Sequence, residues 1–143
     1  MSTLERAIEI AARNHAGQLD KGGQPYVLHP LRLMLAVRGN HERIAAVLHD
    51  VVEDTSVTLK DLEGEGFSRE VVAAVEALTK AEGETRLAAA RRAAKNPIAR
   101  VVKLADVMDN MDLSRIAEPT ERDMARIREY EQVRALLLSH EPV

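Results

Sequence analysis

One short segment carries four side chains that can bind a metal ion or move a proton: His49, Asp50, Glu53 and Asp54. The residues around them are apolar and follow a helical spacing; they are Ile44, Val47, Leu48, Val51 and Val52. A buried helix face normally excludes charge, because an unpaired buried ion is costly. On a continuous helix, residues three and four apart place their β-carbons roughly 5–6 Å from each other. The cluster therefore indicates a divalent-cation site, whereas Glu53 and Asp54 alone would indicate a solvated helix end.

Two further fragments add polar side chains of the same kind. His29 directly precedes Pro30, which favours the first position of a helix. Asp106 interrupts another apolar run, and Asn110 follows one turn later on the same face. Taken singly, a histidine before a proline can cap a helix, and a lone aspartate often pairs with an arginine.

Together these fragments give a mixed nitrogen and oxygen donor set: His29, His49, Asp50 and Asp106. Such a set suits one Mn²⁺, Fe²⁺ or Zn²⁺ ion in an open site, and it does not suit a closed structural zinc site. The chain has no cysteine, which excludes a thiolate site and a disulfide framework.

Length and composition predict one compact, all-α, helical domain over residues 1–143. A chain of 143 residues has room for a single core. Apolar residues make up 45% of the chain and charged residues 30%, as in soluble proteins, but aromatic residues only 2%. A core of aliphatic side chains favours helices over strands. The N-terminus lacks a hydrophobic targeting segment, and no apolar stretch could span a bilayer, so we expect a cytoplasmic protein without a membrane partner.

Helical signals run along the whole chain. Helices are expected to begin with a Ser2/Glu5 capping box, at Pro30, at Asn40, at Thr58, at Ser68, near Glu84, at Asn96-Pro97 and at Pro119-Thr120. The helix from Asn40 is expected to continue through His49-Asp50. Helical spacing predicts inward positions that include Val101, Met108 and Met124.

Charge is distributed unevenly along the chain. The net charge of −3 argues against a protein that binds a nucleic acid polymer. Between Glu84 and Asp106, however, all the charged residues are basic; they are Arg86, Arg91, Arg92, Lys95, Arg100 and Lys103. This stretch is either a solvated helix face or part of a pocket for phosphate. A small anionic ligand fits an acidic protein with one basic patch better than a polymer does.

These motifs, in this order, resemble the HD superfamily of metal-dependent phosphohydrolases. More narrowly, they resemble the hydrolase domain of RelA/SpoT-type alarmone enzymes and the small alarmone hydrolases. The matching stretches cover most of the chain; they are His15-Ala16-Gly17-Gln18, Lys21, Gly23, Pro25-Tyr26, His29-Pro30, Leu48 to Thr55, Leu78-Thr79-Lys80, Lys103-Leu104-Ala105-Asp106 and Asn110.

The resemblance implies a reaction, the removal of pyrophosphate from the 3′ position of (p)ppGpp. The residues that hold one Mn²⁺ in that family match His29, His49, Asp50 and Asp106. Those that position and deprotonate the attacking water match Glu53 and Asp54, and the one matching Asn110 contacts the nucleotide. The chemistry agrees, because a divalent ion activates water and neutralises phosphate charge, and a nearby carboxylate can take the proton.

The chain departs from the family pattern at two positions. Lys21 matches the lysine of an Arg-Lys pair whose arginine packs on the purine, but Asp20 replaces that arginine. A carboxylate does not stack as a guanidinium does, so an adenine analogue such as (p)ppApp becomes more credible. Asp20 could instead accept a hydrogen bond from a base amino group or point into water. Val107 replaces a usual basic residue, which we interpret as a packing change.

Two residues of the last predicted helix, Arg126 and Tyr130, match the region where small alarmone hydrolases hold phosphate and ribose. An exposed arginine and a half-buried tyrosine are the alternative. His15 is expected to form hydrogen bonds at a helix end, and His41 and His140 are expected at the surface.

Two other functions remain open. The same fold and metal could serve another nucleotide, as in an NADPH phosphatase or a dNTP hydrolase. A metal-bearing sensor or partner-binding module with little turnover is the non-enzymatic alternative. Such a module has no need for Glu53 and Asp54 beside its metal, so the sequence favours an enzyme.

Overall fold

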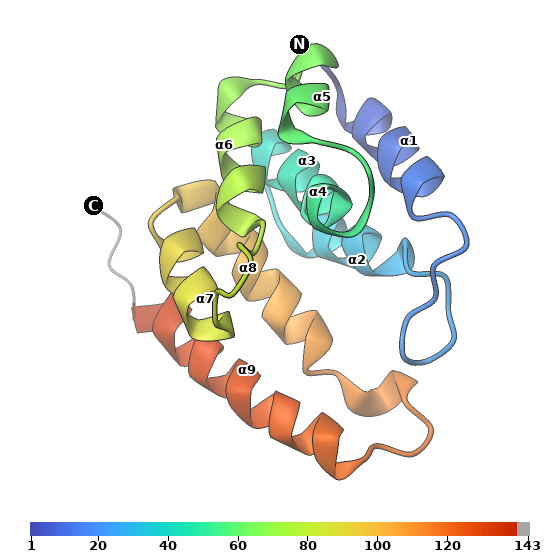
Figure 1. Ribbon diagram of the computed structural model, residues 1–143, viewed down its shortest axis with the longest axis vertical. Coiled ribbons are helices and arrows are strands. Elements are labelled where there is room, and N and C mark those ends of the chain that lie inside the picture. Colours follow the sequence, from blue (N-terminus) through green and yellow to red (C-terminus); the bar gives the residue numbers. More distant parts are fainter. Residues whose placement is uncertain (140–143) are drawn as a thin grey trace.

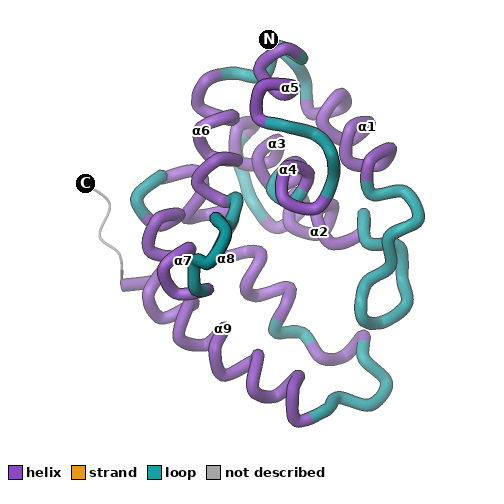
Figure 2. Tube along the Cα trace, in the orientation of Figure 1, coloured by secondary structure: helices purple, strands orange, loops and turns teal. Residues whose placement is uncertain are grey.

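The computed structural model describes residues 1–139 as helices packed around one central helix (Figure 1). In chain order the elements are α1 Leu4–Asn14, α2 Leu28–Ala36, α3 Asn40–Leu48, α4 Val51–Asp54, α5 Leu59–Gly64, α6 Arg69–Leu78, α7 Arg86–Ala94, α8 Pro97–Asn110, the 3₁₀ helix η1 Leu113–Arg115 and α9 Glu121–Ser139. Over these residues the extended pairing is limited to one isolated bridge, Leu19–Pro25, and Figure 2 accordingly shows helices and loops alone. The predicted all-helical fold class is confirmed. His140 lies outside the described residues.

The central element is α3, which packs against α1, α2, α6 and α8. Every residue from Ile44 to Leu48 is at most 2% exposed. Val47 and Leu48 join one buried cluster with apolar residues of α1, α5 and α6. Ala45 and Ala46 join a second cluster with residues of α2, α6 and α8. Small side chains on that face let the neighbouring helices approach α3 closely. None of the helices within residues 1–139 combines the length and apolar character needed to cross a membrane.

The last helix, α9, packs against α7 and α8 and closes the lower half of the molecule as drawn in Figure 1. Val133 and Leu137 of α9 are buried, as predicted, together with Ala90 and Ala94 of α7. Val107 belongs to the same cluster and is 1% exposed. Its burial supports the interpretation of this family departure as a packing change.

Side-chain caps begin most of these helices. Thr58, Ser68 and Asn96 cap α5, α6 and α8 as predicted, each accepting a backbone N–H of the first turn. The predicted capping box at Ser2 is wrong, because Thr3 caps α1 instead.

Two helix boundaries near the predicted metal ligands differ from expectation. The second helix begins at Leu28, so His29 lies within its first turn rather than before it. The third helix ends at Leu48, and His49 and Asp50 form a turn before α4 begins. The cause is local: the His49 imidazole Nδ1 hydrogen-bonds the Ala46 carbonyl at 2.7 Å, the group that a continuing helix would offer to the Asp50 N–H.

Three residues predicted to face inward are exposed. Val101 is 39%, Met124 45% and Met108 49% exposed. The inward side of α8 is turned by one position from the expected stripe, and its buried residues are Ala99, Val102, Asp106 and Val107. Because α8 turns the Asp106 carboxylate inward, its apolar residues Val101 and Met108 lie at the surface.

Arg92 joins the end of α6 to α7. Its guanidinium donates to the carbonyls of Glu76, Ala77 and Thr79 at 3.0, 3.1 and 2.6 Å. It also binds the Glu84 carboxylate through two nitrogens at 3.1 and 2.8 Å. A cation at these carbonyls satisfies groups that the helix end leaves without partners.

Replacing Glu84 by glutamine should remove a pH-dependent part of the stability. The Arg92 guanidinium, helped by the Ala81 N–H, lowers the pKa of Glu84 from its usual 4.5 to about 2. A carboxyl group whose pKa falls on folding stabilises the folded state above its unfolded pKa, and that contribution is lost as the pH falls through the folded pKa. We therefore expect Glu84→Gln to have a lower Tm at neutral pH, with the deficit shrinking between pH 4.5 and 2.

Thermal melts followed by circular dichroism across this pH range check the prediction. Glu82→Gln removes an exposed acid from the same segment and serves as the matched control. Equal losses of Tm in both variants at every pH would contradict a specific role for the Glu84–Arg92 pair.

Candidate metal centre

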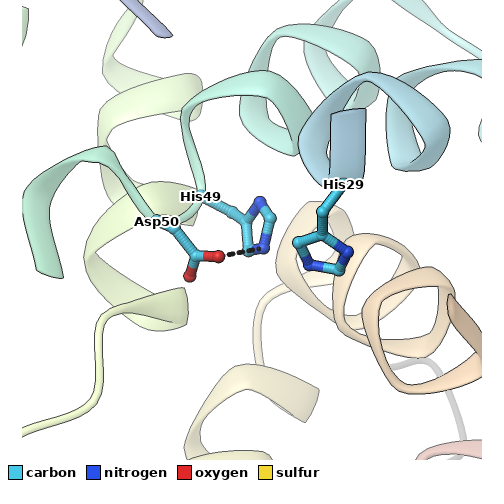
Figure 3. A group of neighbouring side chains, drawn as sticks. All are labelled: His29, His49 and Asp50. Atoms are coloured by element: carbon cyan, nitrogen blue, oxygen red, sulfur yellow. Dashed lines mark ion pairs between the residues drawn. The ribbon is translucent and has the colours of Figure 1, made fainter. Parts of the chain in front are cut away.

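Three of the predicted metal ligands gather between α2 and the turn that separates α3 from α4. Figure 3 shows His49 and Asp50 on that turn, with His29 reaching toward them from the first turn of α2. One donor atom of each residue lies within 4.8 Å of the other two. The packing of α2 against α3 brings the first turn of α2 to this place.

The fourth predicted ligand, Asp106, reaches the same place from α8 and is 8% exposed. Its Oδ1 lies 2.9 Å from His29 Nε2 and 3.6 Å from His49 Nε2. The packing of α8 against α2 and α3 positions this carboxylate. The structure thus brings together all four residues that the sequence selected, and their role as ligands remains a prediction.

The carboxylates of Asp50 and Asp106 make this buried position strongly favour positive charge. Burial alone would keep His49 neutral, but the two carboxylates raise its pKa well above the usual 6.5. Burial raises the pKa of Asp106. Nevertheless, Lys103 and the two histidines, His29 and His49, hold this pKa well below its ordinary value.

The donor atoms themselves fit a divalent cation. Because the His49 Nδ1 is engaged by the Ala46 carbonyl, Nε2 is the ring nitrogen that faces the site. This Nε2 is buried and forms no hydrogen bond of ordinary geometry within residues 1–139, although Asp50 Oδ2 lies 2.9 Å away. A buried polar atom without a partner is unusual, and a metal ion would satisfy it. Two imidazoles with carboxylates and no thiolate suit Mn²⁺, Fe²⁺ or Zn²⁺.

Tyr26 contacts this group and was not assigned a role from the sequence. Its hydroxyl donates to Asp50 Oδ2, and its ring lies 5.0 Å from the His15 ring and 5.7 Å from that of His29. Burial and the Asp50 charge raise the pKa of the phenol, so it stays a proton donor that orients the carboxylate. Tyr26 stands in a motif that precedes His29, but only the loop geometry reveals its partner. His15, as predicted, forms hydrogen bonds at a helix end, with Gln18 as the side-chain partner at 2.9 Å.

The two predicted catalytic carboxylates lie on α4 immediately after Asp50. Oxygen atoms of Asp50, Glu53 and Asp54 lie within 4.8 Å of one another. Glu53 Oε1 accepts the backbone N–H of Lys80 at 2.8 Å, which anchors it to the segment after α6. Partial burial, with the charges of Asp50 and Glu53, raises the pKa of Asp54 to about 6. A carboxylate with a pKa near neutrality is suited to accept a proton.

A cavity of about 280 Å³ opens beside these side chains, and we call it the metal cavity. Its charged lining residues are Asp50, Glu53, Asp54, Asp106, Lys80, Arg86 and Lys103. Lys103 Nζ lies 3.1 Å from Asp106 Oδ2, and the Arg86 guanidinium lies 4.8 Å from the centre of the Tyr130 ring. An anion in this cavity would therefore meet both cationic side chains and the candidate metal ligands.

The basic stretch from Arg86 to Lys103 therefore divides between the two expected roles. Arg86 and Lys103 line the metal cavity. Arg91 and Lys95 are exposed, as on a solvated face. Arg92 belongs to neither group, because it is occupied by Glu84 and by backbone carbonyls.

A second cavity of about 260 Å³ adjoins the first, and we call it the loop cavity. Asn110 lines both, and its side-chain amide donates to Asp106 Oδ1 at 3.0 Å. Lys21 lies at the exposed edge of the loop cavity, with Nζ 3.9 Å from Asp123 Oδ1. Two of the predicted substrate contacts, Lys21 and Asn110, thus line one cavity with the candidate ligand His29.

The Asp20 side chain forms hydrogen bonds within its own loop, which the sequence analysis did not predict. Its Oδ1 accepts the backbone N–H groups of Gly22 and Gln24, both at 2.9 Å. The turn presses the backbone of Gly22 so close to the Arg115 carbonyl that an added Cβ would lie 2.4 Å from that oxygen. Asp20 therefore organises the loop. A hydrogen bond from its carboxylate to a base amino group stays a prediction, and Asp20 lines the loop cavity.

Arg126 and Tyr130 of α9 meet Lys21 and Asn110 around a small cavity of about 60 Å³. The Arg126 guanidinium is held there by Asp123. Tyr130 also lines the metal cavity. The structure thus brings all four predicted substrate contacts together around this small cavity, and two of them, Asn110 and Tyr130, also line the metal cavity.

Comparisons with known proteins identify a family and several relatives of this chain. A family model described as "HD domain" matches residues 7–140. A probable GTP pyrophosphokinase of Mycobacterium leprae is 39% identical in an alignment of 150 positions that covers 96% of this chain and 19% of that protein. A guanosine-3′,5′-bis(diphosphate) 3′-pyrophosphohydrolase of Aquifex aeolicus is 38% identical in an alignment of 122 positions that covers 76% of this chain and 17% of that protein. The chain thus spans about a fifth of the length of these relatives.

A solved structure titled "A metazoan ortholog of SpoT hydrolyzes ppGpp and plays a role in starvation responses" superimposes with a TM-score of 0.82. It is 25% identical, and the match covers 99% of this chain and 88% of that one. The resemblance first indicated by the motifs is confirmed by these findings. The histidine and aspartate pairs, the helical fold and the match over residues 7–140 together establish that the chain belongs to the HD domain family.

Proposed function

We propose that this chain is a metal-dependent phosphohydrolase that removes the 3′-pyrophosphate of (p)ppGpp or of a related purine alarmone such as (p)ppApp. The observation that carries the proposal is the assembly of two buried imidazoles and two carboxylates beside two further acids and a cavity lined in part by cations. The names of its relatives support the same chemistry, since one is a guanosine-3′,5′-bis(diphosphate) 3′-pyrophosphohydrolase. The substrate would be a small anionic purine nucleotide.

His29, His49, Asp50 and Asp106 would hold one divalent cation, for which we propose Mn²⁺, with Fe²⁺ or Zn²⁺ as alternatives. When bound, such an ion lowers the pKa of water and neutralises charge on phosphate. Tyr26 would keep the Asp50 carboxylate in place through its hydroxyl.

Glu53 and Asp54 would orient the attacking water and take its proton. The anchoring of Glu53 to the Lys80 amide suits a positioning role, because that oxygen is held by a fixed donor. The pKa of Asp54, about 6, suits proton acceptance. The cations Lys80, Arg86 and Lys103 would face the pyrophosphate group, whose negative charge they offset.

Lys21, Asn110, Arg126 and Tyr130 would bind the nucleoside and its remaining phosphates, since they line one small cavity together and two of them, Asn110 and Tyr130, also line the metal cavity. Asn110 would lie nearest the reaction, because its amide already contacts Asp106. Arg126 and Lys21 supply positive charge, and Tyr130 an aromatic surface that also carries the Arg86 guanidinium.

Incubation of the Mn²⁺-loaded protein with ppGpp, ppApp, NADPH and deoxynucleoside triphosphates tests the proposal. We expect ion-exchange chromatography to find pyrophosphate and a nucleoside diphosphate from ppGpp or ppApp. Glu53→Gln keeps the acceptor for Lys80 but loses the charge, so it should retain metal while turnover falls roughly 10²–10⁴-fold. Release of inorganic phosphate from NADPH alone, hydrolysis of deoxynucleotides alone, or no turnover by the wild type would each contradict the proposed reaction.

Loss of a ligand should abolish metal binding as well as activity. We expect His49→Ala and Asp106→Ala to lose Mn²⁺ in calorimetric titrations without substrate, because each removes a donor atom of the candidate site. His41→Ala changes a histidine at the other end of α3 and should bind Mn²⁺ as the wild type does. Circular dichroism confirms that each variant is folded. Full metal occupancy in both ligand variants would refute the proposed shell.

The loop residue Asp20 should affect substrate affinity without selecting the base. Asp20→Asn retains an oxygen that can accept the Gly22 and Gln24 amides, so kcat/KM for ppGpp and ppApp should stay near wild type. Asp20→Arg loses this turn, and we expect KM to rise for both substrates by a similar factor. A changed ratio of kcat/KM between the two substrates in Asp20→Arg would instead identify this position as a determinant of base preference.

A further inference from the structure

His29 is held on both sides by carboxylates of α8. Its Nε2 faces Asp106 at 2.9 Å, and its Nδ1 lies 2.6 Å from Asp109 Oδ2. The two aspartates are three residues apart, so they share one face of the helix. The His29 side chain is 6% exposed, and that of Asp109 is 13% exposed. A buried imidazole between two carboxylates on one helix has little freedom to rotate.

The other candidate histidine is held differently. His49 Nδ1 faces the neutral carbonyl of Ala46 at 2.7 Å. The contact between His29 and Asp109 is shorter, and its acceptor is ionised, which makes such hydrogen bonds roughly twice as strong as neutral ones. The Nδ1 atoms of the two imidazoles therefore have different partners, a carboxylate for His29 and a backbone carbonyl for His49.

Asp109 is kept ionised by its own surroundings. Arg32 donates to both of its oxygens, Nε to Oδ1 at 2.8 Å and Nη2 to Oδ2 at 3.0 Å. Arg115 Nη2 lies 3.5 Å from Oδ2 and donates to the Asp109 carbonyl at 2.9 Å. These contacts give the carboxylate one fixed orientation, with an oxygen toward His29.

We propose that Asp109 is a positioning residue for the metal site, which holds the proton of His29 on Nδ1 and presents Nε2 as a ligand. The inference rests on the metal site described under the proposed function. A carboxylate behind a metal-binding histidine fixes the tautomer and the ring orientation and makes the imidazole a stronger donor, and removal of such a partner typically weakens metal binding about 10- to 100-fold. Arg32 and Arg115 support the same arrangement by fixing Asp109.

The test is Mn²⁺ binding by Asp109→Asn and Asp109→Ala, measured by calorimetry without substrate. Asparagine keeps the shape but loses the charge, and alanine removes the acceptor, so we expect affinity to fall in both, by about 10- to 100-fold in the alanine variant. Asp112→Asn is the matched control. Asp112 also pairs with Arg115, at 3.0 Å, but it lies outside the hydrogen-bond partners of His29.

Nitrogen-15 NMR of the imidazoles without metal gives a second readout that a merely structural role would not change. Wild type should keep the Nδ1-protonated form of His29 when neutral, whereas Asp109→Ala should lose this preference while its circular dichroism stays native. If alanine prevents folding, the asparagine variant still decides the matter. Wild-type affinity and an unchanged tautomer in Asp109→Asn would overturn the role of Asp109. Failure of the wild type to bind Mn²⁺ would instead refute the metal site itself.

Discussion

The buried carboxylate of Asp106 is the constraint on which the site depends. Inside a helical bundle a negative charge must be matched by nearby donors and cations. Three groups donate to it or pair with it, namely His29, Lys103 and Asn110, at distances of 2.9 to 3.1 Å. Each belongs to a part of the proposed chemistry: a metal ligand, a phosphate-facing cation and a nucleotide contact. One charge on α8 would thus fix the relative places of the proposed metal, phosphate and nucleoside.

The core explains how these groups can meet. Ala45 and Ala46 of α3 let α2 and α8 approach, so that side chains from three helices converge within a few ångströms. In the turn that follows α3, His49 Nε2 lies 2.9 Å from Asp50 Oδ2, and His29 of α2 lies close to the same pair. Two residues that are adjacent in the chain thus become candidate ligands of one site.

The sequence was sufficient for the fold class and for selecting four candidate ligands that lie close together, but not for the geometry that connects them. Aliphatic composition and capping residues such as Thr58 and Ser68 predict helices because these signals are local. The sequence did not predict the break at His49, because the break depends on the hydrogen bond between the His49 imidazole and the Ala46 carbonyl. Val101 and Met108 were placed inward because periodicity ignores the burial of a charged residue such as Asp106. Tyr26 and Asp109 escaped notice because their roles arise from partners distant in the chain.

The peptide group between Thr79 and Lys80 links the surface of the protein to its proposed water-binding carboxylate. Its carbonyl accepts from Arg92 at 2.6 Å, and its N–H donates to Glu53 at 2.8 Å. The cation on one side and the anion on the other polarise the same amide plane, and each strengthens the hydrogen bond made by the other. A charge on the outer helix α7 therefore acts on the reaction centre through a single rigid unit of backbone. Evolution could tune the orientation of Glu53 by changing residues around Arg92 that never touch the substrate.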